Sequence, residues 1–167
     1  ACLMQLKNQV EWALHCCSVL AAVPEGKAVP ASVLAEFHGV PKDYLAKALQ
    51  NLAQAGIIIG TLGPSGGYRL ANDPAEVTFL DIIEAIEGQR LTFVCNGIRR
   101  NNPCLTGDEK RCTMAQPCVV AKVMWDADEA WRNHLRSVRL SDLLKTLSDE
   151  VPADILDKGK AWMLDRC

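Results

Sequence analysis

The chain has 167 residues, of which 49% are hydrophobic and 23% are charged, and its mean hydropathy is +0.03. These values are typical of a globular protein large enough to bury a core. The net charge of −2 and the pI of about 5.9 argue against a strong non-specific polyanion binder, so any nucleic-acid-binding surface must be local.

No apolar run is long enough to span a bilayer, and the N-terminus lacks the pattern of a signal peptide, which predicts a cytoplasmic protein. In a reducing cytoplasm, the eight cysteines are expected to be buried, metal-binding or redox-sensing rather than paired in a disulfide framework. Cys16 and Cys17 fall within a predicted helix and are expected in the core.

The first half of the chain predicts three helices. Apolar residues recur at three- and four-residue steps from Asn8 to Ala22, and Pro24 follows. Pro30 begins a second helix that Gly39 ends, and Pro41 begins a third that runs to Gly56. Two short helices joined by a glycine-containing turn are typical of a helix-turn-helix.

A hairpin and a fourth helix follow. Residues 57–59 and 68–70 are β-rich and flank a glycine-rich loop, which predicts a wing. Thr78 and Asp81 have the spacing of a capping box for a helix from Phe79 to Glu87. We therefore predict a mainly α winged helix-turn-helix fold, with a DNA-binding domain at residues 1–74 and a cluster-binding loop with dimerisation helices at residues 75–167.

Residues 90–117 lack any periodicity and predict a long loop that needs something else to hold it. A long helix from about Cys118 to Ser137 follows, with an apolar stripe that includes Val119, Val123 and Trp131. Such a stripe is often the seam of a homodimer, and an intramolecular packing face is the alternative. Ser141 is predicted to cap a short helix to Leu147, and residues 152–164 to form the last helix.

The exposed start of the third helix would enter the major groove of double-stranded DNA. Lysines and a tyrosine hydroxyl suit phosphate contacts, and the wing can add backbone amides and an arginine. The alternative is that these groups form a solvated polar surface. The predicted DNA-binding residues are Lys42, Asp43, Tyr44, Lys47, Ser65, Gly66, Gly67 and Arg69.

Four cysteines lie between Cys95 and Cys118, and thiolates suit zinc or iron–sulfur clusters. The spacing Cys112-x5-Cys118 is looser than that of most zinc sites, so thiol redox chemistry and incidental cysteines stay open. Glu11 and His15, at i and i+4, share one helix face, where such a pair is most often a surface pair.

Several segments together carry a family resemblance. Residues 44–56, the run Gly-Pro-Ser-Gly-Gly-Tyr-Arg-Leu at 63–70, and the helix at 77–83 resemble the Rrf-type iron–sulfur winged helix regulators. The similarity extends over nearly the whole chain. Leu62 stands where several members carry a minor-groove arginine, and the family's first loop cysteine is displaced here to Cys104.

Residues 10–17 are most similar to the start of the redox-sensing members. There, a glutamate and a histidine of one subunit bind one iron of a 2Fe–2S cluster, and two loop cysteines of the other subunit bind the second iron. The resemblance implies Glu11, His15, Cys112 and Cys118 as ligands, with Cys104 as the reserve. If three cysteines are used, the cluster would look more like that of other members, and 4Fe–4S is the alternative type.

This implied site predicts a redox or nitric-oxide sensor in which changes at the cluster shift the first helix and re-aim the recognition helices. Trp12 would transmit such a shift, or else be a core or interface residue. His38 is a candidate protonation partner near the cluster, or else a satisfied turn histidine.

Two cluster-free alternatives stay open. One is a thiol switch in which Cys104, Cys112 and Cys118 form disulfides, helped by Lys110 and Arg111, and the other is a regulator whose loop is held by zinc. No enzyme is predicted, because the sequence offers no phosphate-binding loop and no nucleophile motif.

Overall fold

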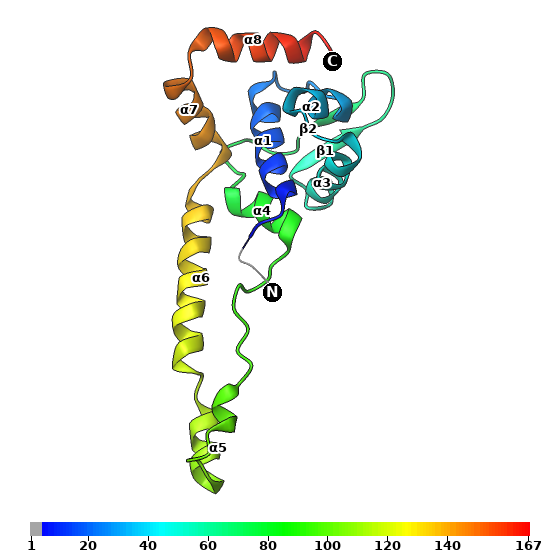
Figure 1. Cartoon of the computed structure of the whole chain (residues 1–167). Helices are drawn as coiled ribbons and strands as arrows, with labels where there is room; N and C mark the ends of the chain where they lie inside the picture. Colours follow the sequence, from blue (N-terminus) through cyan, green and yellow to red (C-terminus); the bar gives the residue numbers. More distant parts are fainter. Residues whose placement is uncertain (1–4) are drawn as a thin grey trace. The chain divides into compact units, whose positions relative to one another are not determined.

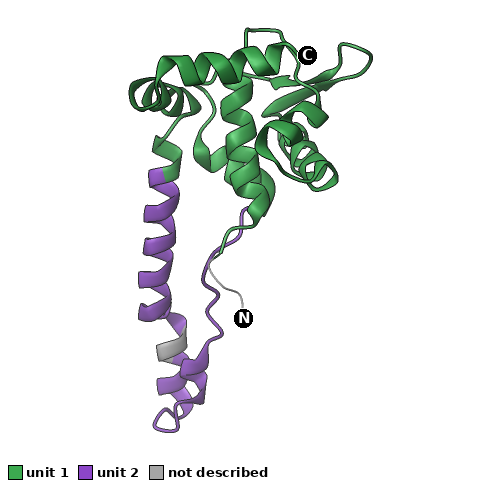
Figure 2. Ribbon diagram, turned by 45° about the horizontal axis from the view of Figure 1, so that its top comes forward, with its two compact units in different colours: residues 1–88, 135–167 green, residues 89–134 purple. Residues whose placement is uncertain are grey.

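The computed structural model describes residues 5–111 and 115–167. It is mainly helical with one two-stranded antiparallel sheet (Figure 1), which confirms the predicted fold class. The chain forms two compact units, one of residues 1–88 with 135–167 and the other of residues 89–134 (Figure 2). None of the described helices is both long and apolar enough to cross a membrane.

The helix-turn-helix lies in the first unit. It consists of α2 (Ala31–His38) and α3 (Lys42–Gln54), and α1 (Asn8–Ala22) precedes it; all three are close to the predicted helices. Gly39 ends α2 in the left-handed conformation, with φ of 63°, and its amide donates to the Glu36 carbonyl over 3.2 Å. This tight turn places Pro41 directly before α3, so the two helices are joined as the motif requires.

The wing consists of β1 (Ile58–Thr61) and β2 (Gly67–Leu70), paired with Ile58 opposite Leu70. Tyr68 of β2 also exchanges two backbone hydrogen bonds of 2.8 Å with Val29, the residue before Pro30. The wing is therefore attached to the segment that leads into the helix-turn-helix.

Replacing Gly67 by alanine is expected to lower the free energy of unfolding by about 2–4 kcal/mol. Gly67 has φ of +154°, and a Cβ there would lie 2.4 Å from the Val29 carbonyl carbon. Gly63→Ala is the matched control, because Gly63 also has a positive φ (+104°) but nothing within 4 Å of an added Cβ. Urea denaturation should show a clearly larger loss for Gly67→Ala, and equal losses would contradict the close approach of wing and Val29.

The core of the first unit surrounds α1, which packs against α3, α4 (Phe79–Glu87) and α7 (Leu140–Glu150). Cys16 and Cys17 are fully buried, as predicted, and burial raises the pKa of the Cys16 thiol to about 12. These two cysteines therefore act as small apolar core residues. The other fully buried large side chains include Leu34, Leu45, Leu49, Leu52, Ile58 and Ile82.

Helix α4 (Phe79–Glu87) begins at the predicted capping box, in which the Thr78 hydroxyl and the Asp81 carboxylate each accept the other residue's backbone amide. The prediction that Ser141 caps the next helix is wrong. Helix α7 (Leu140–Glu150) begins two residues earlier than that cap implies, with Arg139 as the N-cap, whose amide donates to the Asp142 carboxylate over 2.9 Å. Helix α8 (Ala153–Leu164) follows Pro152, as predicted.

The second unit corrects the prediction of a long unstructured loop. Residues 90–117 contain a short 3-10 helix, η1 (Ile98–Asn101), and a helix, α5 (Gly107–Ala115), which contacts η1. These two structural units do not correspond to the predicted functional domains, residues 1–74 for DNA binding and residues 75–167 for cluster binding and dimerisation. That functional division stays a prediction.

Polar side chains of helix α6 (Val119–Ser137) make its contacts within the second unit. Arg132 pairs with the buried Asp128 at 3.1 Å and donates to the Arg90 carbonyl over 2.8 Å. The predicted apolar stripe faces outward, since Val119, Val120 and Val123 are each more than 60% exposed. In a single chain this stripe is therefore uncovered.

Candidate DNA-binding and cluster-binding residues

The recognition helix α3 has one buried and one exposed face. Leu45, Ala48, Leu49 and Leu52 are completely buried, which fixes the helix against the core. The predicted DNA-contacting residues Lys42, Asp43, Tyr44 and Lys47 are all exposed near its start. Their positions agree with the prediction, and their contact with DNA stays a prediction.

The wing presents a mixed surface. Ser65 is exposed, and Arg69 is partly exposed, with its Nη1 3.4 Å from the Leu70 carbonyl. The Gly66 amide donates to the Gly63 carbonyl over 2.9 Å, so that amide already has a partner in the wing turn. Leu62 is fully exposed, so the wing offers an apolar side chain rather than a cation at this point.

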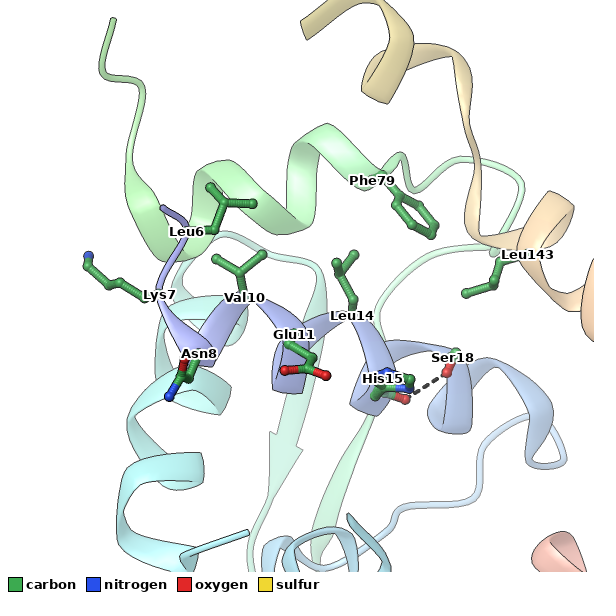
Figure 3. A pocket seen from close by; sticks show the side chains of 10 residues that line it. All are labelled: Leu6, Lys7, Asn8, Val10, Glu11, Leu14, His15, Ser18, Phe79 and Leu143. Carbon is green, nitrogen blue, oxygen red and sulfur yellow. Dashed lines mark hydrogen bonds between the residues drawn. The ribbon is translucent and has the colours of Figure 1, made fainter. Parts of the chain in front are cut away.

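Glu11 and His15 project from the same side of α1, one turn apart (Figure 3). They border a groove of about 400 Å³, whose apolar lining includes Leu14, Phe79 and Leu143. Both side chains are exposed, and neither makes a side-chain hydrogen bond or ion pair with the described residues. The structure thus brings together a carboxylate and an imidazole that are available to a ligand.

Two further residues adjoin this pair. The His38 ring lies 5.8 Å from that of His15, and burial lowers the pKa of His38, which the neighbouring His15 lowers further. His38 ends α2, and its Nε2 is buried with no hydrogen-bond partner among the described residues; its role stays a prediction. Trp12 is partly buried and packs against the core.

The loop cysteines lie in the second unit. Cys112 lies outside the described residues, and Cys104 is exposed. Cys118 lies directly before α6, where hydrogen bonds from the amide of Ala121 and then of Val120, the charge of Arg99 and a hydrogen bond from Cys95 lower its thiol pKa. No group of three or more metal-binding side chains occurs within the described part of the chain.

Two contacts were missed by the sequence analysis. The Gln9 side chain donates to the Tyr44 carbonyl over 3.3 Å and so links the start of α1 to the recognition helix. No local signal predicts a contact between residues so distant in sequence. The ion pair of Asp128 and Arg132, by contrast, could have been predicted, because the two residues carry opposite charges at i and i+4 of one helix.

The Rrf2 family profile, described as an iron-dependent transcriptional regulator, matches residues 6–146. The chain belongs to the Rrf2 family. It is 32% identical to BadM of Rhodopseudomonas palustris, named as an HTH-type transcriptional regulator, over 88% of this chain and 85% of that protein. Protein rrf2 of Nitratidesulfovibrio vulgaris is 29% identical over 74% of this chain and 77% of its own length.

Solved structures show the same fold. The IscR structure from T. potens has a TM-score of 0.67 at 22% identity and covers 90% of this chain and 93% of its own. CymR, the global cysteine regulator of B. subtilis, has a TM-score of 0.65 at 20% identity, covering 86% and 98%. The protein is therefore an Rrf2-family, DNA-binding transcriptional regulator with a winged helix fold, and its relatives are regulators rather than enzymes.

Proposed function

We propose that this Rrf2 regulator is a homodimer whose affinity for operator DNA is controlled by an iron–sulfur cluster. Glu11 and His15 of one subunit and Cys112 and Cys118 of its partner are the proposed ligands of a 2Fe–2S cluster. The observation that carries the proposal is the exposed Glu11–His15 pair, which lies on one face of α1 and whose side chains make no hydrogen bond or ion pair with the described residues.

The donor types fit such a group. Thiolates and imidazoles both ligate 2Fe–2S clusters, and a carboxylate is a further anionic donor. The iron-dependent description of the family favours iron over zinc. When bound, the cluster supplies a change of charge by one electron, which suits a redox or nitric-oxide sensor. In an alternative ligand set, Cys104 is a third cysteine ligand and replaces Glu11 or His15. A 4Fe–4S cluster would go with this alternative set.

Helix α1 can pass a change at Glu11 and His15 to DNA because it packs directly against α3. Gln9, two residues before Glu11, holds the Tyr44 carbonyl in the first turn of the recognition helix. Trp12 follows Glu11 in α1 and packs against the core, and the His38 ring of α2 lies 5.8 Å from that of His15, so a rotation of α1 would change the surroundings of both. We therefore propose Trp12 and His38 as residues that transmit the signal.

The proposal assigns DNA binding to residues 1–74 and cluster binding and dimerisation to residues 75–167, and it places the protein in the cytoplasm with its operator. A cluster-free thiol switch is the second candidate. The lowered pKa of the Cys118 thiol, caused first by the hydrogen bond from the Ala121 amide, favours it because a thiolate reacts with oxidants more readily than a thiol.

Cluster control is tested by measuring operator affinity in anaerobic protein with and without its reconstituted cluster. The probe is a duplex selected from a random pool by the reconstituted protein. A difference of about 5–150-fold is expected, corresponding to a coupling of about 1–3 kcal/mol. Equal affinities of the two forms would refute cluster control, and a difference produced only by thiol oxidation would favour the second candidate.

The DNA-binding surface has its own test. Lys47→Ala is expected to weaken binding to the same duplex about 5–10-fold. The slope of log affinity against log salt concentration should become shallower by about 1, because one phosphate contact is lost. Lys145→Ala removes an equally exposed lysine from α7 and is the matched control. Equal behaviour of the two variants in fluorescence anisotropy titrations would show that α3 does not meet DNA through Lys47.

A further inference from the structure

A second cavity lies in the first unit, further along α1 than the groove beside Glu11. It has a volume of about 460 Å³ and is bordered by residues of α1, α2, α7 and α8. Binding sites for small organic molecules typically have volumes of about 300–1,000 Å³ and a mostly apolar lining. The lining of this cavity is also mostly apolar and includes Val19, Leu144, Leu147 and Leu156. Its size and its lining therefore suit a small organic ligand.

Helix α8 leaves two large apolar side chains at this cavity uncovered. The helix is attached to the core near its C-terminal end, where Met163 is buried and the Trp162 ring lies 5.6 Å from that of Phe37 in α2. Ile155, in the first turn of α8, borders the cavity and is 55% exposed. Phe37 also borders it and is 39% exposed. A ligand in the cavity would remove apolar surface of both side chains from water, which favours binding.

One polar atom at the cavity has no partner in the protein. His38 borders the cavity, and its Nε2 is buried without a hydrogen-bond partner among the described residues. Ser18 borders the cavity too, but its hydroxyl already donates to the His15 carbonyl over 2.7 Å. Since a buried polar atom without a hydrogen bond is unfavourable, His38 Nε2 is the group that a polar atom of the ligand would satisfy.

The charges at the cavity favour a neutral ligand. Asp157 and Lys160 of α8 both border it, and both are exposed. One carboxylate and one ammonium group together give no net charge, so they select neither an organic anion nor an organic cation. A hydroxyl group is the neutral group that fits His38 best, because it can donate to Nε2 or accept from it, whichever ring nitrogen of His38 carries the hydrogen.

We propose that this cavity binds a neutral phenol-type molecule, with its aromatic ring among the apolar side chains and its hydroxyl paired with His38 Nε2. An aromatic ring suits the cavity because the rings of Phe37 and His38 already meet edge to face, with centroids 5.1 Å apart, and a further ring can join them. The ligand would contact the helix-turn-helix directly, since both residues belong to α2. The site needs no iron, and Glu11 does not border it.

The test measures the binding of 2-naphthol to the full chain, from which a chelator has removed any iron so that the hydroxyl cannot bind to metal. Isothermal titration calorimetry is expected to give a dissociation constant between about 10 µM and 1 mM, as is usual for a ligand of this size. The anion 2-naphthoate has the same ring system and should bind at least about tenfold more weakly, because its carboxylate loses water without gaining a counter-charge.

Variants locate the ligand. Ala22 borders the cavity from an exposed position at the end of α1, so Ala22→Phe should fill the cavity and abolish detectable binding. Ala161→Phe is the matched control, because Ala161 is an exposed residue of α8 that does not border the cavity, and this variant should bind as the wild type does. His38→Phe keeps a ring but loses Nε2, and it should bind 2-naphthol about fivefold more weakly. Thermal unfolding checks that each variant is folded.

Four results would overturn the proposal. A folded wild type that does not bind 2-naphthol has no such site, and unchanged binding by Ala22→Phe would place the ligand elsewhere. Equal affinities of wild type and His38→Phe, or equal affinities for 2-naphthol and 2-naphthoate, would refute the proposed ligand class. Binding by a monomeric Val123→Glu chain alone would assign the cavity to a second copy of the chain. All four leave the cluster proposal untouched, because no iron is present.

Discussion

Replacing Glu11 and His15 together by alanine is expected to abolish stable cluster binding. Two of the four proposed ligands are lost. Mutation of residues that only support metal ligands already lowers metal affinity about 10–100-fold, so the iron and sulfide retained after gel filtration should fall about tenfold or more. Both side chains are exposed and make no side-chain hydrogen bond with the described residues, so the fold should be unaffected. Iron and sulfide assays with an anaerobic visible spectrum measure the effect.

Glu36→Ala is the matched control, because Glu36 is an exposed carboxylate on the neighbouring helix α2. It should keep the spectrum and iron content of the wild type, and thermal unfolding should show all three cluster-free proteins equally stable. A double variant whose chromophore is unchanged would contradict ligation by Glu11 and His15. If Cys104→Ser then removed that chromophore, the three-cysteine variant of the site would be correct.

Placing a charge on the exposed stripe of α6 is expected to break the homodimer. Val123 is 61% exposed in the single chain, within a stripe that continues through Val119, Val120 and Trp131. In a dimer seam, Val123→Glu would bury an unpaired carboxylate on each side. The cost of about 3 kcal/mol or more corresponds to at least about a hundredfold rise in the dimer dissociation constant. Light scattering after gel filtration across a dilution series measures it.

Lys122→Glu introduces the same side chain at the neighbouring exposed position, outside the predicted stripe. This control should stay dimeric, while Val123→Glu should become monomeric and, with it, lose cluster binding. A Val123→Glu protein that keeps the wild-type mass at every dilution would show that the stripe is not the seam.

The elements predicted well are those specified by local chemistry. Helices α1 and α4 have the predicted bounds, because the apolar period of α1 and the Thr78–Asp81 capping box lie within the segments themselves. The wing was equally readable from its glycines, although the contact that makes Gly67 necessary is with Val29, far away in sequence.

Helix α5 shows why the second unit was harder to predict. Its sequence is polar, so apolar periodicity gives no signal, and only Asp108 and Glu109 in its first turn hint at a helix start. The start of α7 depends on its packing beside residues 74–78, which a single sequence does not reveal. For the site, the i and i+4 spacing predicted that Glu11 and His15 lie together, whereas the hydrogen bond from Gln9 to the Tyr44 carbonyl depends on the tertiary fold.

Subunit mixing tests most directly the central claim that one cluster is bound by two chains. The Glu11→Ala/His15→Ala chain and a Cys118→Ala chain should each bind almost no iron alone. When equal amounts of the two chains are mixed, unfolded and refolded together, about half of the dimers should be heterodimers. Each heterodimer has one intact site and one site that lacks Glu11, His15 and Cys118, so about a quarter of the wild-type iron should return. Iron that stays at the level of the separate variants, although native mass spectrometry shows heterodimers, would contradict a cluster shared between subunits.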